Sequence, residues 1–178
     1  MGVTAVINGV TFALYGTLTA TLAPSQPVGV EFTPVMNGPV TGQWTISATS
    51  EYSASGQIAS AWLACTPGNE PTWTDKWSSA AQATPSAAQV WTLQSSASFQ
   101  ISALHLISRP DANTLEARSF QIMDNLTGNV LYDTGSASLT WADGEEKAFA
   151  FPALVTQSIS VRVTASDSLC QFKVRLFS

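Results

Sequence analysis

Strict alternation of apolar and polar residues near the C-terminus is the feature that most constrains how this chain folds. Residues 158–165 read Ser-Ile-Ser-Val-Arg-Val-Thr-Ala, and residues 169–176 repeat the pattern with four apolar residues on one face. Successive side chains of a β-strand point to opposite sides of the sheet, so this pattern predicts strands with one buried face. Residues 158–176 are therefore expected to form two half-buried antiparallel strands.

Further short strands are predicted upstream, separated by turn sequences such as Arg109-Pro110-Asp111 and Ala142-Asp143-Gly144. The predicted strands cover residues 89–93, 99–108, 117–123, 129–132 and 147–151. No segment predicts a helix of useful length. Short strands at this spacing are typical of an all-β protein, and we expect an antiparallel β-sandwich of about eight strands over residues 43–178. Seven residues are expected in its core: Trp91, Phe120, Ile122, Val161, Val163, Phe172 and Val174.

The first 42 residues differ in character from the rest. Residues 3–7 and 10–15 flank Asn8-Gly9, which is the strongest short signal for a β-hairpin. Residues 23–40 contain four prolines and a single charged residue, a composition that favours an extended connection. We therefore expect residues 1–42 to be an N-terminal segment for attachment or oligomerisation, ahead of the sandwich.

Composition excludes several classes of function. Only 11% of the 178 residues are charged, against about 25% in ordinary globular domains. The 7 Lys and Arg residues do not cluster, so a nucleic-acid partner is not expected. No apolar run approaches the roughly 20 residues that span a bilayer, and the N-terminus lacks the basic leader of a secretory signal. Cys65, Cys170 and His105 lack metal-ligand spacing. For the two cysteines, a disulfide and two buried thiols both agree with the sequence.

Catalytic arrangements are weakly supported. Glycoside hydrolysis needs two carboxyl groups about 5 to 9.5 Å apart, but the acidic residues fall mostly in predicted turns without a motif. Glu145 and Glu146 are neighbours on a strand edge, so their side chains should point apart. His105 shares a predicted strand face with Ile101 and Ala103, which favours a structural role in the sheet. We therefore expect that the chain is not an enzyme.

Taken in order, the motifs after residue 43 resemble the discoidin, or coagulation-factor type C, family of galactose-binding-like jelly rolls. The similar segments are Thr45-Ile46-Ser47-Ala48-Thr49-Ser50, Ser60-Ala61-Trp62, Trp73-Thr74-Asp75-Lys76-Trp77, Gln89-Val90-Trp91-Thr92-Leu93, residues 101–111, residues 119–124 with Gly128, and Ser160-Val161-Arg162-Val163. The resemblance covers about 130 residues and depends on their order and spacing. It implies a jelly-roll sandwich with its ligand site in loops at one end.

Three loops carry groups suited to a sugar, because aromatic rings stack on sugar faces and polar side chains bond hydroxyls. They span residues 71–76, 109–116 and 50–53. The candidate ligand-binding residues are Trp73, Asp75, Arg109, Asp111, Asn113 and Tyr52. Arg109 could instead form a structural ion pair, and Asp111 and Asn113 are common turn formers. Trp62, Trp77 and Trp91 match framework positions and are expected in the core, while Trp141 is an alternative stacking platform.

The resemblance also raises the question of calcium, which many members of the family hold through oxygen ligands. Two positions depart from the family pattern: Leu63-Ala64 replaces its Asp-Gly, and Gln171 replaces its C-terminal glutamate. We therefore expect no cofactor. If calcium is present, Gln171 and backbone carbonyls near Cys65 would have to hold it.

These features together favour a non-catalytic carbohydrate-binding module that recognises a neutral cell-surface glycan. An N-terminal hairpin, low charge and no evident signal peptide are typical of phage tail and other virion proteins, so we expect a receptor-binding or adhesion module that is virion-associated or extracellular. It should be a homo-oligomer or part of a larger assembly. The alternative is a structural or protein-binding jelly roll of a phage tail or capsid without glycan affinity.

Overall fold

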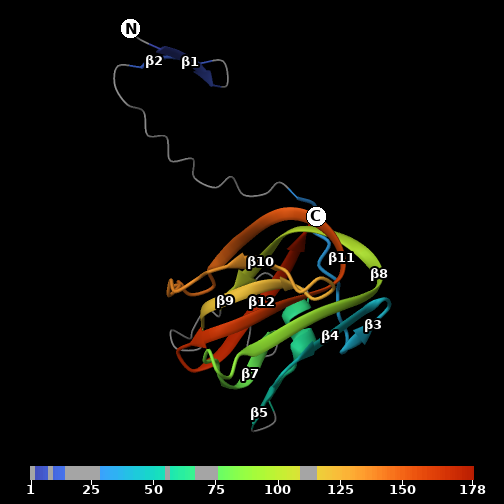
Figure 1. The fold of residues 1–178 in the computed structure, drawn as a ribbon. Helices are drawn as coiled ribbons and strands as arrows, with labels where there is room; N and C mark the ends of the chain where they lie inside the picture. Colours follow the sequence, from blue (N-terminus) through green and yellow to red (C-terminus); the bar gives the residue numbers. More distant parts are fainter. Residues whose placement is uncertain (1–2, 8–9, 15–28, 55–56, 67–75, 109–115) are drawn as a thin grey trace.

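The computed structural model describes residues 3–7, 10–14, 29–54, 57–66, 76–108 and 116–178. In these ranges the chain is built of strands and one short 3₁₀ helix, η1 (Ala61–Cys65) (Figure 1). The strands are β1 (Val3–Ile7), β2 (Val10–Leu14), β3 (Val40–Thr41), β4 (Trp44–Ala48), β5 (Tyr52–Ala54), β6 (Gln57–Ala59), β7 (Trp77–Gln82), β8 (Gln89–Ile107), β9 (Ala117–Asp124), β10 (Val130–Asp133), β11 (Glu146–Ser166) and β12 (Leu169–Phe177). None of the described helical segments is long and apolar enough to cross a membrane.

Two long antiparallel strands, β8 and β11, belong to both layers of the sandwich. In one layer, the first part of β8 pairs with β4 and β11 pairs with β9, which carries β10 at the edge. In the other layer, the last part of β8 pairs with β12, whose first residues pair with β7. Both long strands curve over from one layer to the other (Figure 1). The expected antiparallel jelly-roll sandwich is therefore confirmed.

The curve in β11 coincides with breaks in its register. Pairing with β8 shifts between Ala150 and Leu154 and again between Thr156 and Ser158. Pro152 lies inside the first shift, where a proline costs no ladder hydrogen bond. The separate strands expected at residues 89–93 and 99–108 are thus one strand, and so are those at 147–151 and 158–165. Polar residues and a proline at the bend concealed this continuity from the sequence pattern.

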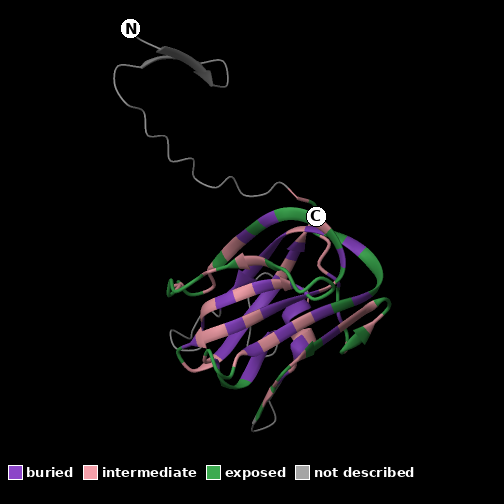
Figure 2. Ribbon diagram, in the orientation of Figure 1, coloured by how far each residue is buried: buried purple, intermediate pink, exposed green. Residues whose placement is uncertain are grey.

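The core lies between the two layers, and buried positions alternate with exposed ones along the strands (Figure 2). All seven residues expected in the core are buried, each at 2% exposure or less. Trp77 and Trp91 are fully buried, as expected, whereas Trp62 is half-buried and packs against the core. Alternation on half-buried strands therefore identified the core correctly.

The N-terminal hairpin expected around Asn8-Gly9 is present, with Ile7 opposite Val10 and Val3 opposite Leu14. Its two strands form a sheet of their own among the described strands. How residues 1–42 attach or assemble stays a prediction.

The packed part of the chain begins near Val30, ahead of the boundary expected at residue 42. The amide of Phe32 donates to the carbonyl of Leu176 over 3.0 Å, and the amide of Ser178 donates to that of Val30 over 3.0 Å. The Phe32 ring lies 5.8 Å from that of Phe99, and Met36 is 2% exposed within the core. Residues 30–36 therefore contribute an edge segment beside β12 and part of the core.

Candidate binding site

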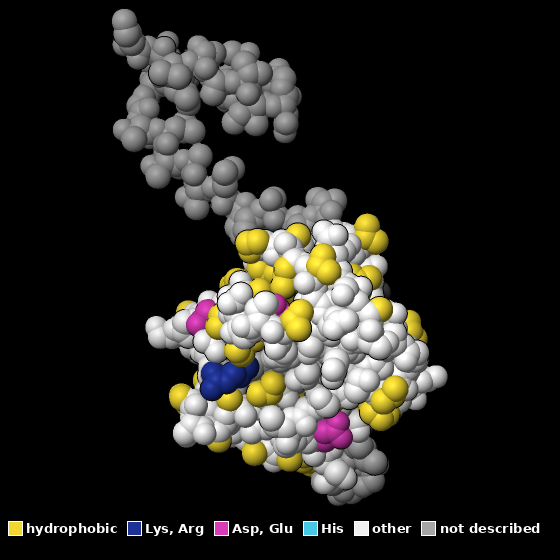
Figure 3. Space-filling view, turned by 45° about the vertical axis from the view of Figure 1, so that its right-hand side comes forward, with side chains coloured by type: hydrophobic (Ala, Val, Ile, Leu, Met, Phe, Trp, Pro, Cys, Tyr) yellow, Lys and Arg dark blue, Asp and Glu magenta, His cyan; other side chains and the backbone are white. Residues whose placement is uncertain are grey.

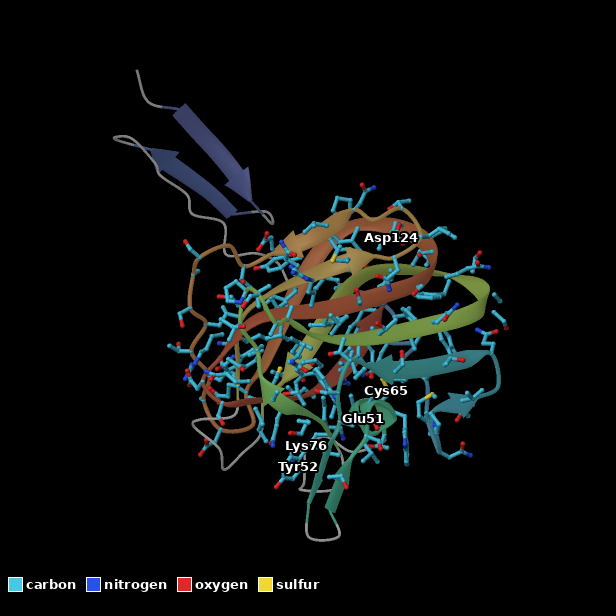
Figure 4. All side chains as sticks on the ribbon, turned by 60° about the horizontal axis from the view of Figure 1, so that its bottom comes forward. Glu51, Tyr52, Cys65, Lys76 and Asp124 are labelled. Carbon is cyan, nitrogen blue, oxygen red and sulfur yellow. The ribbon has the colours of Figure 1, made fainter. Side chains whose placement is uncertain are left out.

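The sandwich has two ends that differ in what they carry. At one end, which we call the terminal end, β8 and β11 bend and the C-terminus lies beside Val30. The opposite end, which we call the loop end, holds β5, η1 and the start of β7. Figure 4 shows Glu51, Tyr52 and Lys76 grouped at the loop end, with Asp124 far away.

The register of the sheet places the bases of two candidate loops on one row. Ile107, near the start of the loop at residues 109–115, pairs with Lys173 of β12. The neighbouring pair of Phe172 with Trp77 places Lys76 at the position opposite Lys173. Lys76 directly follows residues 67–75, so the residues that border both candidate loops lie on one row of the sheet, on the two strands that flank β12.

The third candidate loop is fixed at its base by hydrogen bonds. The indole nitrogen of buried Trp77 donates to the carbonyl of Ser50 over 2.9 Å. The hydroxyl of Ser50 donates to Oε1 of Gln89 over 2.6 Å and accepts from the amide of Ala80 over 3.0 Å. Oε1 of Glu51 accepts from the amide of Ala61 over 2.7 Å. Residues 50–52 are thus held against β7, β8 and η1, and the structure brings the bases of all three loops to one end.

The structure describes one of the six site residues expected from the sequence. Tyr52 is at the loop end as expected, half-buried at the start of β5. The other five candidates, Trp73, Asp75, Arg109, Asp111 and Asn113, lie outside the described residues. Their roles stay predictions.

Glu116 is a buried acid directly after residues 109–115, and no sequence motif marks it. It is 2% exposed, and its Oε1 atom has no hydrogen-bond partner. Burial raises the pKa of its carboxyl group, and the guanidinium of Arg118, 3.5 Å away, opposes that rise. Only its place at the end of the predicted loop at residues 109–116 could have marked it, because burial depends on contacts remote in sequence.

Trp141, the alternative stacking platform, lies beside the same loop. Its indole nitrogen donates to the carbonyl of Ala117 over 2.8 Å, and Nζ of Lys147 lies 5.3 Å from the ring centroid. The hydroxyl of Ser108 donates to the carbonyl of Ala142 over 2.7 Å. These bonds hold the half-buried ring next to both ends of the loop at residues 109–115.

The described residues do not fit a calcium ion at Gln171. Its Nε2 donates to the hydroxyl of Ser78 over 3.1 Å, and its buried Oε1 has no partner. Buried Lys173 lies on the same face of β12, two residues after Gln171. Burial raises the pKa of the Cys65 thiol, and the nearby charge of Lys173 offsets part of that rise. An ammonium group in this neighbourhood repels a second cation, and no described group of three acidic, His or Cys side chains could hold a metal ion.

The acidic pair and the histidine occupy structural positions. Glu145 Oε2 accepts from the amide of Ala142 over 2.8 Å. Glu146 accepts from Nδ1 of His105 over 2.6 Å and from Arg175 over 3.1 Å, so the two carboxylates point apart as expected. The His105 ring stacks on Phe177 with centroids 4.1 Å apart. These contacts fit a role in the sheet rather than paired carboxyls around a scissile bond.

The two cysteines are free thiols in the structure. Cys65 is at the end of η1 and Cys170 is in β12, and both are buried. Burial raises the pKa of both thiols.

Comparison with known proteins gives matches in structure only. No protein-family model matches the sequence, and no curated protein matches it. A family 32 carbohydrate-binding module from Clostridium perfringens, in complex with GalNAc-β-1,3-galactose, superposes with a TM-score of 0.58 at 15% identity, over 76% of this chain and 95% of that one. The chain has a galactose-binding-like fold.

Two further solved structures support this assignment. A fucose-binding module from Streptococcus pneumoniae matches with a TM-score of 0.54 at 14% identity, over 74% of this chain and 89% of that one. A fucolectin from the serum of striped bass, Morone saxatilis, matches with a TM-score of 0.58 at 12% identity, over 76% of this chain and 47% of that one. The predicted resemblance to galactose-binding-like jelly rolls is thereby confirmed at the level of fold.

Proposed function

We propose that this chain is a non-catalytic carbohydrate-binding module that binds neutral glycans through its loop end. The observation that carries the proposal is the meeting, at one end of the sandwich, of the bases of three loops whose sequences contain Trp73, Tyr52 and several polar residues. Sites with several weak polar contacts gain affinity when their base is already ordered, because less conformational entropy is lost on binding. The bonds that fix residues 50–52 to Trp77, Gln89 and Ala80 supply that order.

The electrostatics of the loop end favour a neutral ligand. Three described acids at this end have partners within the protein: Glu51 accepts from the amide of Ala61, Glu145 pairs with Lys147, and Asp167 pairs with Arg118. Carboxylates and cations that are already paired leave little net charge for a charged ligand to pair with. The two carbohydrate-binding modules with the same fold support the same ligand class, since one is described in complex with GalNAc-β-1,3-galactose and the other as fucose-binding.

We further propose that the module belongs to a virion or cell-surface assembly, where it recognises a receptor glycan outside the cell. The N-terminal hairpin would attach it to that assembly, since it forms a sheet separate from the sandwich. The separate sheet of the hairpin and the low content of charged residues support this part of the proposal.

A glycan array probed with the labelled full chain tests the function. We expect binding to a small set of neutral glycans and little loss of signal at moderate salt, because hydroxyl hydrogen bonds are less screened than ion pairs. Trp73→Ala should then weaken binding by about 1 to 3 kcal/mol, roughly tenfold or more, if the ring stacks on sugar.

The matched control is Val155→Ala, at an exposed position of the terminal end, which should leave glycan affinity unchanged. Thermal melting of both variants should stay close to that of the wild type. A folded wild-type chain that binds no glycan on the array would refute the proposal and favour the alternative of a structural or protein-binding jelly roll. Unfolding of Trp73→Ala would place that ring in the framework instead.

A further inference from the structure

Charged side chains gather around Glu116 at the loop end. We call this group the Glu116 cluster; its members are Glu116, Arg118, Asp143, Glu145, Lys147 and Asp167. Such a concentration is unusual in a chain of which only 11% is charged, and charged side chains are sparse on the face shown in Figure 3. The cluster has four carboxyl groups and two cations, so two negative charges stay uncompensated when all four carboxyl groups are ionised.

Glu116 is poorly placed to carry a charge. Its side chain is 2% exposed, and its Oε1 atom has no hydrogen-bond partner. Its Oε2 atom lies 3.5 Å from Nη1 of Arg118, beyond the roughly 3.2 Å limit of a good hydrogen bond. A buried carboxylate is costly unless cations and hydrogen bonds satisfy it, so this environment favours the neutral acid.

Arg118 is committed to two other groups. Its Nε atom donates to Oδ2 of Asp167 over 2.8 Å, and its Nη1 atom donates to the carbonyl of Leu139 over 2.7 Å. The amide of Leu139 donates in turn to the carbonyl of Arg118 over 2.8 Å. Arg118 therefore joins β9 to the connection between β10 and β11 and to the turn between β11 and β12. It cannot move fully onto Glu116 without lengthening these bonds.

The remaining charges of the cluster oppose ionisation of Glu116. Lys147 of β11 is paired with Glu145, while Asp143 and Asp167 add further negative charge. Burial and the charges of these three acids raise the pKa of Glu116, and the guanidinium 3.5 Å away only partly offsets that rise. Glu116 therefore exchanges its proton with water at a pH above the ordinary 4.5.

We infer that Glu116 is a pH-sensitive switch that controls how firmly the elements of the loop end are held together. The neutral acid leaves Arg118 bonded to Leu139 and Asp167, so the three elements stay joined. The carboxylate competes with Asp167 for the guanidinium, and those bonds weaken. The only covalent change is one proton exchanged between the carboxyl group of Glu116 and water.

The switch adjoins the proposed glycan site, because Glu116 directly follows the candidate loop at residues 109–115. Its consequence for binding rests on the proposed function. A site whose base is already ordered loses less conformational entropy on binding, so glycan affinity should be higher in mild acid than in mild base. The switch itself is tested without a glycan.

Urea unfolding of the wild-type chain and of Glu116→Gln, from about pH 4 to about pH 8, measures the proton linkage. Glutamine is neutral at every pH and close in shape to the protonated acid. The two urea midpoints should differ little below pH 4.5, and the wild type should become the less stable chain as the pH rises through the folded pKa of Glu116. A wild type that equals or exceeds Glu116→Gln in stability at the upper pH would overturn the inference.

The matched control is Glu31→Gln, which makes the same substitution at a carboxyl group whose pKa is lowered by a bond from Arg175. Its difference in midpoint should open in the opposite direction, with the wild type the more stable chain as the pH rises. Differences of the same sign at both positions would mean that the substitution rather than the proton sets them, and the inference would fail.

Amide hydrogen exchange separates a switch from an acid that titrates without loosening the structure. At the upper pH, residues 139–145 and 166–169 should exchange about threefold or more faster in the wild type than in Glu116→Gln, and at about pH 4.5 both chains should exchange equally. Comparison of the two chains at one pH cancels the intrinsic pH dependence of exchange. Equal exchange at the upper pH would refute the switch. Because no glycan is used, a chain that passes both tests but binds no glycan refutes the proposed function alone.

Discussion

Replacement of Trp91 by alanine should cost more stability than any exposed substitution in this chain. The side chain is fully buried in β8, and its indole nitrogen donates to the carbonyl of Ala61 in η1 over 2.9 Å. Truncation of a buried tryptophan costs about 3 to 5 kcal/mol through lost transfer free energy and the cavity left behind. The lost hydrogen bond adds about 1 kcal/mol. We therefore expect a loss of about 4 to 6 kcal/mol, a large share of the 5 to 15 kcal/mol typical of a domain.

Urea unfolding followed by far-ultraviolet circular dichroism measures this loss. With a urea dependence of about 2 kcal/mol per molar, the midpoint should fall by roughly 2 to 3 M. Trp91→Phe keeps most of the ring and should lose about 2 to 3 kcal/mol, which guards against a variant too unstable to measure. Val35→Ala, at 66% exposure, is the control and should change stability by less than about 0.5 kcal/mol. A loss below about 2 kcal/mol for Trp91→Ala would refute our account of how η1 is held to the core.

Three further results are expected. Cys65 and Cys170 should not react with a thiol reagent in the folded protein, because both are buried and burial raises the pKa of each thiol. In denaturant, two thiols should react. If no thiol reacts in denaturant, the two cysteines form a disulfide. The bond from Arg175 lowers the pKa of Glu31 below its ordinary 4.5, so its contribution to stability is present above that value and lost as the pH falls through the folded pKa. Wild type and Glu31→Gln should therefore differ in unfolding midpoint at pH 7 and converge as the pH falls through the folded pKa of Glu31, and a gap that stays constant as the pH is lowered would contradict this. Ser50→Ala removes the bonds to Gln89 and Ala80 and should weaken glycan binding with a stability loss of about 1 kcal/mol, whereas unchanged affinity would show that the base of this loop does not order the site.

The sequence was sufficient where one face of a strand is buried. Alternation at residues 158–165 and 169–176 identified the strands and their core faces, because burial of one side leaves a period of two in the residues. It was insufficient at the bend, where a register shift around Pro152 lets β11 continue. Proline content in residues 23–40 indicated an extended path, but it carried no sign that Phe32 and Met36 pack on the sandwich.

For the candidate site, the sequence identified the loops but not the buried residues that lie beside their bases. The resemblance to galactose-binding-like jelly rolls implied three loops at one end, and the register of β7, β8 and β12 brings the residues that border two of them, Lys76 and Ile107, to one row of the sheet. The burial of Glu116 and the cation beside Gln171 arise from neighbours distant in the chain. Contacts between residues remote in sequence leave no period or motif in a single sequence, so these two features can be identified only in the structure.

The edge segment at residues 30–33 has a mechanical consequence. It runs antiparallel to the end of β12, with Val30 beside Ser178, Phe32 beside Leu176, and Glu31 paired with Arg175. A pull on the N-terminal chain, with the protein held at its loop end, acts along this segment rather than across it. The hydrogen bonds and the ion pair are then loaded in shear and share the force, so they must yield together instead of peeling apart singly. The contact between residues 30–33 and β12 should therefore resist rupture when a ligand at the loop end is pulled.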